Sequence, residues 1–193
     1  MILLAALAAG LLAGIGLALS RGKPYRVPSL GHMWVAALAF LPQAFAFYLP
    51  GAGLGRSETT AAGLLLGSQV ILLWFVWLNR RYVGLTLLGA GLVLNLLVIA
   101  VNGGFMPISP ETVSKLATEE GLVFHVGDRF SAKDRIQHTN ETHFAWLSDR
   151  LLTPAWIPYR AAFSLGDVLI ALGAFAFLSL PELTLGPDPR IPI

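Results

Sequence analysis

Residues Val93–Pro107 read VLNLLVIAVNGGFMP, an apolar run that carries one amide side chain, Asn95, and then meets a polar turn. The turn is Asn102-Gly103-Gly104, a combination typical of a helix end because Asn and Gly tolerate positive φ. We interpret the run as the fourth membrane-spanning helix and the turn as its non-cytoplasmic end. Three apolar stretches precede it; most of the charges, three of the four histidines and one last apolar stretch follow it.

The composition is that of a membrane protein. Of 193 residues, 55% are hydrophobic and 12% are charged, which is about half the charged share of a soluble domain. The chain has no cysteine, which excludes disulfides and thiolate metal sites. Its net charge of +2 reflects few charges rather than a basic field, so nucleic acid is not an expected partner.

Five apolar stretches have lengths near those needed to cross a hydrocarbon core about 30 Å thick. Two basic clusters, Arg21 to Arg26 and Arg80-Arg81, are separated by two of these stretches, which puts both on the cytoplasmic side under the positive-inside rule. We therefore predict an all-α integral membrane protein with five transmembrane helices in a single membrane domain, residues 1–193. Its N-terminus lies outside and its C-terminus in the cytoplasm. The predicted helices cover residues 2–19, 33–49, 61–78, 83–101 and 163–180.

Two predicted helices carry glycines four residues apart. Gly10 and Gly14 in the first helix, and Gly63 and Gly67 in the third, form small-xxx-small patterns. Such patterns favour close approach of a second helix. In the second helix, Pro42 predicts a kink whose freed carbonyl needs a partner.

Residues 102–162 are too polar to cross a membrane and too long for a passive connection, so we predict an outer cap with its own structure. Ser109-Pro110-Glu111 is typical of the start of an amphipathic helix, which Gly121 would end. Residues 144–152 are a second candidate amphipathic helix. The tail, residues 181–193, contains four prolines and is predicted to be extended.

Asp149 and Asp167 are the candidate catalytic residues. Ser164 precedes Asp167 by three residues at the start of the last predicted helix, a spacing typical of a capping box. If Asp149 folds back beside Asp167, two carboxylates would share a low-dielectric site and one could hold a proton at neutral pH. Arg150 or Arg160 could equally pair with Asp167 in a structural ion pair, so both interpretations stay open.

A second group of polar residues comprises candidate binding residues. An intramembrane Asn usually bonds to a neighbouring helix, and Asn-Gly-Gly is an ordinary helix end. The functional alternative is that Gly103 and Gly104 expose backbone N–H groups at the mouth of a polar site that contains the two aspartates. The candidates are Asn95, Asn102, Gly103, Gly104, Arg150 and Ser164.

The histidines resemble a metal site in composition only. His138 and His143, in the sequence HTNETH, are five residues apart, whereas the zinc-binding HExxH helix places two histidines four apart on one face. His125 could converge with them. We predict no metal and no cofactor.

The motifs VLNLLVIAVNGGFMPIS, Leu147-Ser148-Asp149-Arg150 and FSLGDVLIALG (residues 163–173), in this order, resemble a bacterial multi-pass membrane family of unknown function, domain-of-unknown-function family 5317. The resemblance covers most of the chain and is strongest in its second half. It implies a location in the bacterial inner (cytoplasmic) membrane and no established activity.

A fainter resemblance concerns the C-terminal third. Asp149-Arg150-Leu151 followed by Phe163-Ser-Leu-Gly-Asp167 is similar to the closing motifs of the lipoprotein signal peptidases, which are membrane aspartyl proteases. Asp167 would match one of their catalytic aspartates. The other lies between the two motifs in that family, where residues 156–159 of this chain contain no acid.

Two functional hypotheses follow. The first is a non-catalytic integral membrane protein, an accessory or scaffold subunit of a bacterial membrane assembly or a lipid-binding component, with membrane lipid and other membrane subunits as partners. The alternative is a membrane-embedded aspartate-dependent hydrolase or transferase that acts on a lipid or lipoprotein at the outer face, with Asp149 and Asp167 as acid and base. A pocket between the cap and the last two helices would favour the alternative. A small-ligand sensor cannot be separated from the first hypothesis by sequence.

Overall fold

The computed structural model describes residues 2–44, 57–116, 124–131, 133–157 and 159–185. Most of it is helical. The helices are α1 (Ile2–Ser20), α2 (Met33–Gln43), α3 (Glu58–Leu78), α4 (Val83–Val101), α5 (Pro110–Leu116) and α6 (Leu165–Ser179). Between α4 and α6 lie the short strands β1 (Met106–Ile108), β2 (Asp134–Ile136), β3 (Leu151–Leu152) and β4 (Ala162–Phe163), with a 3-10 helix over Ala145–Leu147.

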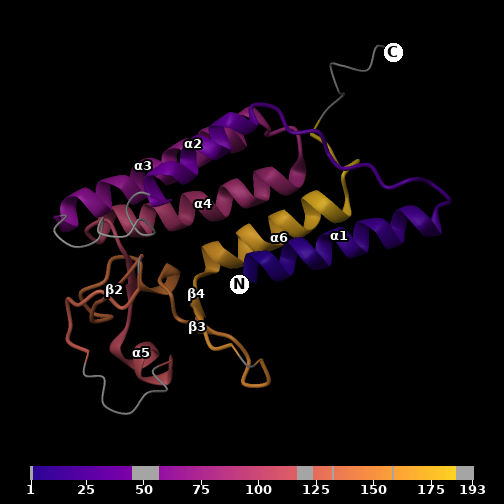
Figure 1. The fold of residues 1–193 in the computed structure, drawn as a ribbon. Helices are drawn as coiled ribbons and strands as arrows, with labels where there is room; N and C mark the ends of the chain where they lie inside the picture. Colours follow the sequence, from indigo (N-terminus) through magenta and orange to yellow (C-terminus); the bar gives the residue numbers. More distant parts are fainter. Residues whose placement is uncertain (1, 45–56, 117–123, 132, 158, 186–193) are drawn as a thin grey trace.

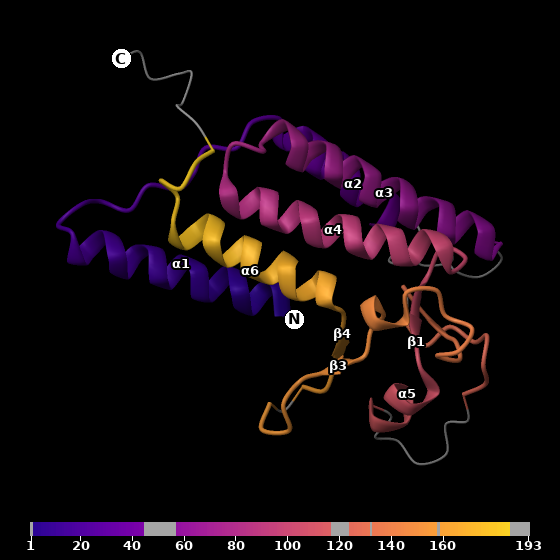
Figure 2. The same ribbon diagram turned by 180° about the vertical axis from the view of Figure 1, so that it is seen from behind.

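The five longer helices form a bundle in which α4 and α6 make the most extensive contact. From α6, α1 packs on one side and α4 on the other; α4 in turn contacts α3, and α3 contacts α2. The elements between α4 and α6 gather at one end of the bundle, beside the end of α4 and the start of α6 (Figures 1 and 2). We call residues 102–162 the cap.

Three of the helices, α1, α3 and α4, are long and apolar enough to cross a membrane. This indicates an integral membrane protein. The bounds of α4 are those predicted from the sequence, whereas α2 and α6 are apolar but shorter. Part of the predicted second helix, residues 45–49, lies outside the described residues.

Glycines bring the backbones of α4 and α6 together. A Cβ atom added to Gly91 would lie 2.8 Å from the backbone nitrogen of Ile170, and one added to Gly173 would lie 2.8 Å from the Cα atom of Leu88. Any side chain at these positions would therefore push the helices apart. The same holds for Gly10 of α1, whose added Cβ atom would lie 2.8 Å from the Phe175 carbonyl oxygen of α6.

Of the two predicted glycine patterns, one lies at a helix–helix contact and the other does not. Gly10 and Gly14 both lie against α6 and are buried, which confirms the prediction for α1. Gly63 and Gly67 have no atom within 4 Å of an added Cβ atom. No helix among the described residues packs closely on that face of α3.

The cap differs from the all-α prediction because it contains two pairs of strands. The predicted helix over residues 144–152 is wrong: only Ala145–Leu147 form a helical turn, of the 3-10 type. Beyond that turn the Asp149 N–H donates to the Pro107 carbonyl, and Leu151 pairs with Phe163, so the backbone is extended. These long-range backbone bonds outweigh the local amphipathic pattern.

The predicted helix after Ser109 is confirmed as α5. The Ser109 hydroxyl accepts a hydrogen bond from the Thr112 N–H at 3.1 Å, the N-cap that its sequence indicates. The predicted stop at Gly121 lies outside the described residues.

Candidate functional site

The segment that leaves α4 organises the cap. Strand β1 pairs in parallel with β2 on one side and bridges to Asp149 on the other, through Ile108. The Met106 N–H also donates to the Lys133 carbonyl at 2.8 Å. Lys133 and Asp149, which are 16 residues apart, are thus held on either side of the same three-residue strand, and their side chains meet.

The start of α6 supplies the second part of the site. The Ser164 hydroxyl accepts from the Asp167 N–H at 3.0 Å, and the Asp167 carboxylate accepts from the Ser164 N–H at 3.1 Å, which together form the predicted capping box. Because Asp167 lies in the first turn, its negative charge also faces the positive end of the helix.

Asn95 of α4 completes this arrangement from the neighbouring helix. Its amide Nδ2 donates to Asp167 Oδ1 at 2.9 Å, and its Oδ1 accepts from the Ser164 hydroxyl at 2.9 Å. Gly166 leaves room for this amide, since a Cβ atom there would overlap the Asn95 side chain. The structure therefore brings together three of the predicted residues, Asn95, Ser164 and Asp167.

Lys133 joins the two aspartates that the sequence singles out. Its ammonium nitrogen lies 3.2 Å from Asp149 Oδ2 and 3.9 Å from Asp167 Oδ2. A third carboxylate, that of Asp134, lies 3.9 Å away and accepts from the Ser131 hydroxyl at 2.6 Å. We call Lys133, Asp134, Asp149 and Asp167 the Lys133 cluster.

Burial determines the electrostatics of this cluster. Asp149 is 1% exposed, and in the described part of the chain its Oδ1 has no hydrogen-bond partner. Burial, together with the nearby carboxylates of Asp134 and Asp167, raises the pKa of Asp149 to about 7, although Lys133 acts in the opposite direction. Burial alone would lower the pKa of the Lys133 ammonium, but the surrounding carboxylates raise it above its ordinary value. Lys133 therefore remains a cation at neutral pH.

A cavity of about 490 Å³ opens beside the cluster. Lys133 and Asp167 line its polar end, together with the cap residues Tyr159 and Ala161 to Phe163. The remaining wall is apolar and comes from the helices α1, α3, α4 and α6: Ile2, Leu3, Leu72, Phe75, Val76, Leu85, Leu88, Leu92 and Ile170. The volume falls in the range of small-molecule sites, about 300–1,000 Å³.

Asn102 holds the cap rather than lining the cavity. It is buried, its Nδ2 donates to the carbonyls of Val98 (2.8 Å) and His143 (2.9 Å), and its Oδ1 accepts from the His143 N–H at 2.9 Å. One amide therefore ties the end of α4 to a cap segment 41 residues further on.

Gly103 and Gly104 form the predicted helix end. Their φ angles are +81° and +88°, and the Gly104 N–H donates to the Ile99 carbonyl at 2.8 Å. Gly104 also packs against Ala62 of α3, where an added Cβ atom would overlap. The Gly104 N–H is thus committed to the helix end, which leaves it unavailable to a ligand.

Arg150 does not reach Asp167. Its side chain is exposed, and within the described part of the chain it has no ion-pair partner. The cation beside Asp167 is Lys133, which the sequence analysis missed along with Asp134. The sequence carries no local signal for either residue: residues 133–136 read Lys-Asp-Arg-Ile, which lacks the alternation of apolar and polar residues typical of a strand with one buried face.

The histidines lie apart from this cluster. His125 is exposed, and its Nδ1 lies 3.6 Å from an Asp128 carboxylate oxygen. His138 and His143 use backbone atoms in their hydrogen bonds, to Thr142 and Asn102 respectively. Among the described residues no group of three or more His, Cys, Asp or Glu side chains is placed to hold a metal ion.

Comparison with known proteins gives the family of this chain. A family model with the description "Family of unknown function (DUF5317)" matches residues 28–179. The chain belongs to this family. The part of the chain that matches DUF5317 begins after α1 and ends with α6, so it includes the cap and the whole Lys133 cluster.

A relative from Thermotoga maritima, named "Uncharacterized protein", is 32% identical over 132 residues, which cover 66% of this chain and 68% of the relative. No solved structure matches the chain. Neither the DUF5317 match nor this relative supports the likeness to lipoprotein signal peptidases.

Proposed function

We propose that this DUF5317 protein is a non-catalytic membrane component that binds a lipid molecule in the cavity beside the Lys133 cluster. The observation that carries the proposal is the form of that cavity. Apolar side chains of four helices make its wall, and an ammonium and a carboxylate lie together at one end. Such a wall suits an acyl chain, because the chain keeps contacts as apolar as those it has in the bilayer.

The polar end suits a head group that carries both signs of charge. Lys133 would donate to a phosphate oxygen, and Asp167 would accept from an amine. Because three carboxylates surround one ammonium, a head group with a cationic amine is favoured over one that is only anionic. We therefore propose a zwitterionic aminophospholipid as the occupant.

The hydrogen bonds at Asp167 favour a binding role over a catalytic one. Both oxygens of its carboxylate already accept hydrogen bonds, from Asn95 and from the Ser164 N–H. A general acid or base must exchange its proton with a substrate, whereas both Asp167 oxygens are already engaged within the protein.

Filling the cavity tests this proposal. Leu88 lines the cavity from α4, whereas Leu97 of the same helix is 40% exposed, so Leu88→Trp and Leu97→Trp form a matched pair. After purification in a mild neutral detergent, native mass spectrometry would count the phospholipids retained by each protein. We expect one phosphatidylethanolamine per chain in the wild type and in Leu97→Trp, and at least a tenfold lower occupancy in Leu88→Trp. Equal occupancy in all three would contradict the proposal.

One observation supports the alternative of an aspartate-dependent hydrolase or transferase. Asp149 has a pKa raised to about 7 and shares the Lys133 ammonium with Asp167. Such a carboxyl group can give or take a proton at neutral pH. Incubation of the protein with vesicles of labelled phospholipid or with a labelled lipoprotein tests this candidate. Turnover that Asp149→Asn abolishes would favour it, and absence of turnover would leave the binding role.

We also propose that α2 and α6 cross the membrane with the three longer helices, which gives five spans in the bacterial inner membrane. The positive-inside rule would place the N-terminus and the cap outside and the C-terminus in the cytoplasm. A fluorescent reporter that folds only in the cytoplasm, fused to the C-terminus, should be bright. A dark fusion that is expressed and inserted would reverse the orientation.

A further inference from the structure

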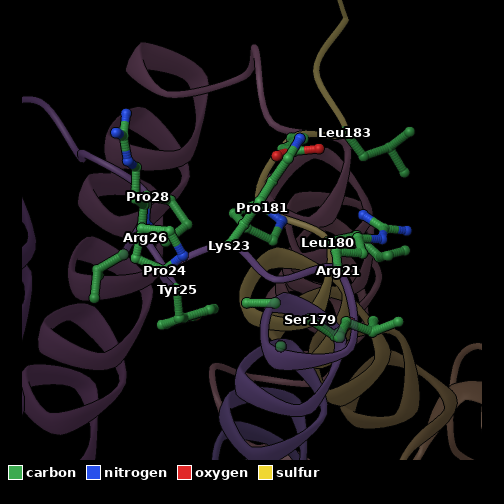
Figure 3. Close-up of a pocket in the computed structure, with 15 residues that line it drawn as sticks. Arg21, Lys23, Pro24, Tyr25, Arg26, Pro28, Ser179, Leu180, Pro181 and Leu183 are labelled. Carbon is green, nitrogen blue, oxygen red and sulfur yellow. The ribbon is translucent and has the colours of Figure 1, made fainter.

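A second and larger cavity lies at the opposite end of the bundle from the cap. Its volume is about 790 Å³, and it lies where the segment after α1 passes the end of α6 (Figure 3). Its wall comes from the last turns of both helices and from the segments that follow them. The lining residues are Gly14, Leu17, Ala18, Arg21, residues 23–28 and residues 179–183.

Three cations line this cavity, Arg21, Lys23 and Arg26. All three are exposed, and within the described part of the chain no carboxylate pairs with any of them. Arg21 and Lys23 lie beside Leu180 and Pro181, and Arg26 lies on the other side of the cavity (Figure 3). Glu182 and the C-terminal ends of two helices offset part of the positive charge, and the balance stays positive.

The segment that carries these cations is held in place. The Tyr25 hydroxyl donates to the Leu178 carbonyl of α6 at 2.9 Å. Gly22, with φ at +65°, turns the chain away from α1, and the Lys23 N–H donates back to the Ala18 carbonyl at 2.9 Å. The cations therefore start from a fixed backbone, which reduces the entropy lost when they bind an anion.

Ser179 is the second observation that indicates a ligand. It is 5% exposed, it lines the cavity, and its hydroxyl has no hydrogen-bond partner among the residues that the structure describes. A serine in a helix normally satisfies its hydroxyl by bonding a carbonyl of the preceding turn. A buried hydroxyl without a partner is destabilising unless something else supplies one.

We propose that this cavity binds the phosphate group of an anionic phospholipid, with Arg21, Lys23 and Arg26 neutralising its charge and Ser179 donating to a phosphate oxygen. The walls argue for a lipid rather than for free phosphate. Leu17, Leu180 and Leu183 are apolar, and the adjoining face of α1 exposes Leu12 (70%) and Leu19 (72%), as a helix in contact with acyl chains would. This site is separate from the aminophospholipid cavity and does not depend on it.

The test uses the full-length protein in a neutral detergent, with dioctanoyl phosphatidylglycerol, dioctanoyl phosphatidylcholine and inorganic phosphate as three separate probes. The midpoint of thermal unfolding is measured against the concentration of each probe. We expect phosphatidylglycerol to raise the midpoint at concentrations at which the other two have no effect. An equal rise with phosphatidylcholine, or a rise with inorganic phosphate alone, would overturn the proposal of an anionic lipid.

Charge-removing variants test whether the stabilisation by phosphatidylglycerol arises from binding in this cavity. Arg21→Gln and Lys23→Gln should each weaken the apparent affinity for phosphatidylglycerol about fivefold. Arg80→Gln removes the same charge outside the cavity lining, where Arg80 lies over the Trp77 ring, and should leave the affinity unchanged. Equal losses in all three variants would show a general surface-charge effect and would overturn the site.

Ser179→Ala distinguishes a binding role of the hydroxyl from a structural one. Because no described residue hydrogen-bonds this hydroxyl, its removal should leave the lipid-free protein at least as stable as the wild type. The same variant should weaken phosphatidylglycerol binding severalfold. A lower stability without lipid, together with unchanged affinity, would remove Ser179 from the proposed site.

Discussion

Asn95 in the middle of α4 and Asp167 in the first turn of α6 are joined by a hydrogen bond of 2.9 Å between Nδ2 and Oδ1. The oxygen of the same amide, Oδ1, accepts a hydrogen bond from the hydroxyl of Ser164, the N-cap of α6. A single amide therefore satisfies the two side chains that begin the neighbouring helix. In an apolar environment, such bonds fix which helices pack together and how far one helix is shifted along the axis of the other.

Replacing Asn95 with Leu should destabilise the protein by about 2–3 kcal/mol, because a buried hydroxyl and a carboxylate lose their partner. The measurement is the free energy of unfolding in mixed micelles of a mild and a denaturing detergent. Thr86→Leu is the matched control: it lies in the same helix, and its hydroxyl bonds backbone carbonyls at a more exposed position. A loss at Asn95 no larger than that at Thr86 would contradict the assigned role.

Glycine substitutions should separate the two faces of the bundle. Gly91→Ala should lower the free energy of unfolding by at least about 2 kcal/mol, because the added methyl group meets the α6 backbone. Gly63→Ala and Gly67→Ala meet open space and should be neutral or stabilising by up to about 1 kcal/mol, the helix-propensity difference. Similar losses at all three positions would mean that the α3 face is also packed against another helix.

Lys133→Met tests the ion cluster. The variant leaves Asp149 buried without its cation, and breaking such a pair is destabilising. Because the Lys133 side chain is 44% exposed, we expect a loss of about 2–3 kcal/mol at pH 8, at the low end for buried pairs. Lys115→Met, at an exposed position on α5, should change stability by less than about 0.5 kcal/mol. An equally mild effect at Lys133 would show that the cluster is solvated.

The pH dependence of stability should carry the signature of Asp149. The unfolded chain releases this proton near pH 3.8, whereas the folded protein holds it up to about pH 7. The folded state therefore binds more protons between these values, and the Asp149 contribution to stability falls as pH rises through this window. The slope is at most about 1.4 kcal/mol per pH unit.

Asp149→Asn removes that titration. The difference in free energy of unfolding between the wild type and the variant should therefore change between pH 4 and about 7 and be constant above it. A difference that is flat across the whole range would show that Asp149 is ionised throughout. Asp128→Asn, at an exposed carboxylate, is the control for a general charge effect.

Sequence periodicity and hydropathy predict where the long helices lie, but they do not predict the structure of the cap. The bounds of α4 follow from its apolar run and its Asn-Gly-Gly end, and the start of α6 follows from the spacing of Ser164 and Asp167. Both signals are local. The strands of the cap are two or three residues long and are defined by pairing between distant segments, such as Met106 with Asp134. No local pattern in residues 144–152 reveals that Asp149 will pair with β1.

In the candidate site, too, residues with a local sequence signal were predicted and residues placed by long-range contacts were not. Asn95, Ser164 and Asp167 were identified because polar residues in apolar helices are conspicuous. Lys133 was missed because a lysine in a polar loop is ordinary until the fold places it between carboxylates. The prediction that Arg150 could neutralise Asp167 was wrong for a related reason, since in an extended segment neighbouring side chains point to opposite faces.

The contact between α4 and α6 has a consequence for how the chain tolerates change. Gly91 of α4 lies against Gly166 at the start of α6, so the two helices that flank the cap contact each other directly. The cap is in effect an insert between two helices that pack on one another. Its length and content can change without dismantling the bundle, and it could be exchanged between related chains as one cassette, provided that Asn95 and Asn102 keep their anchoring contacts.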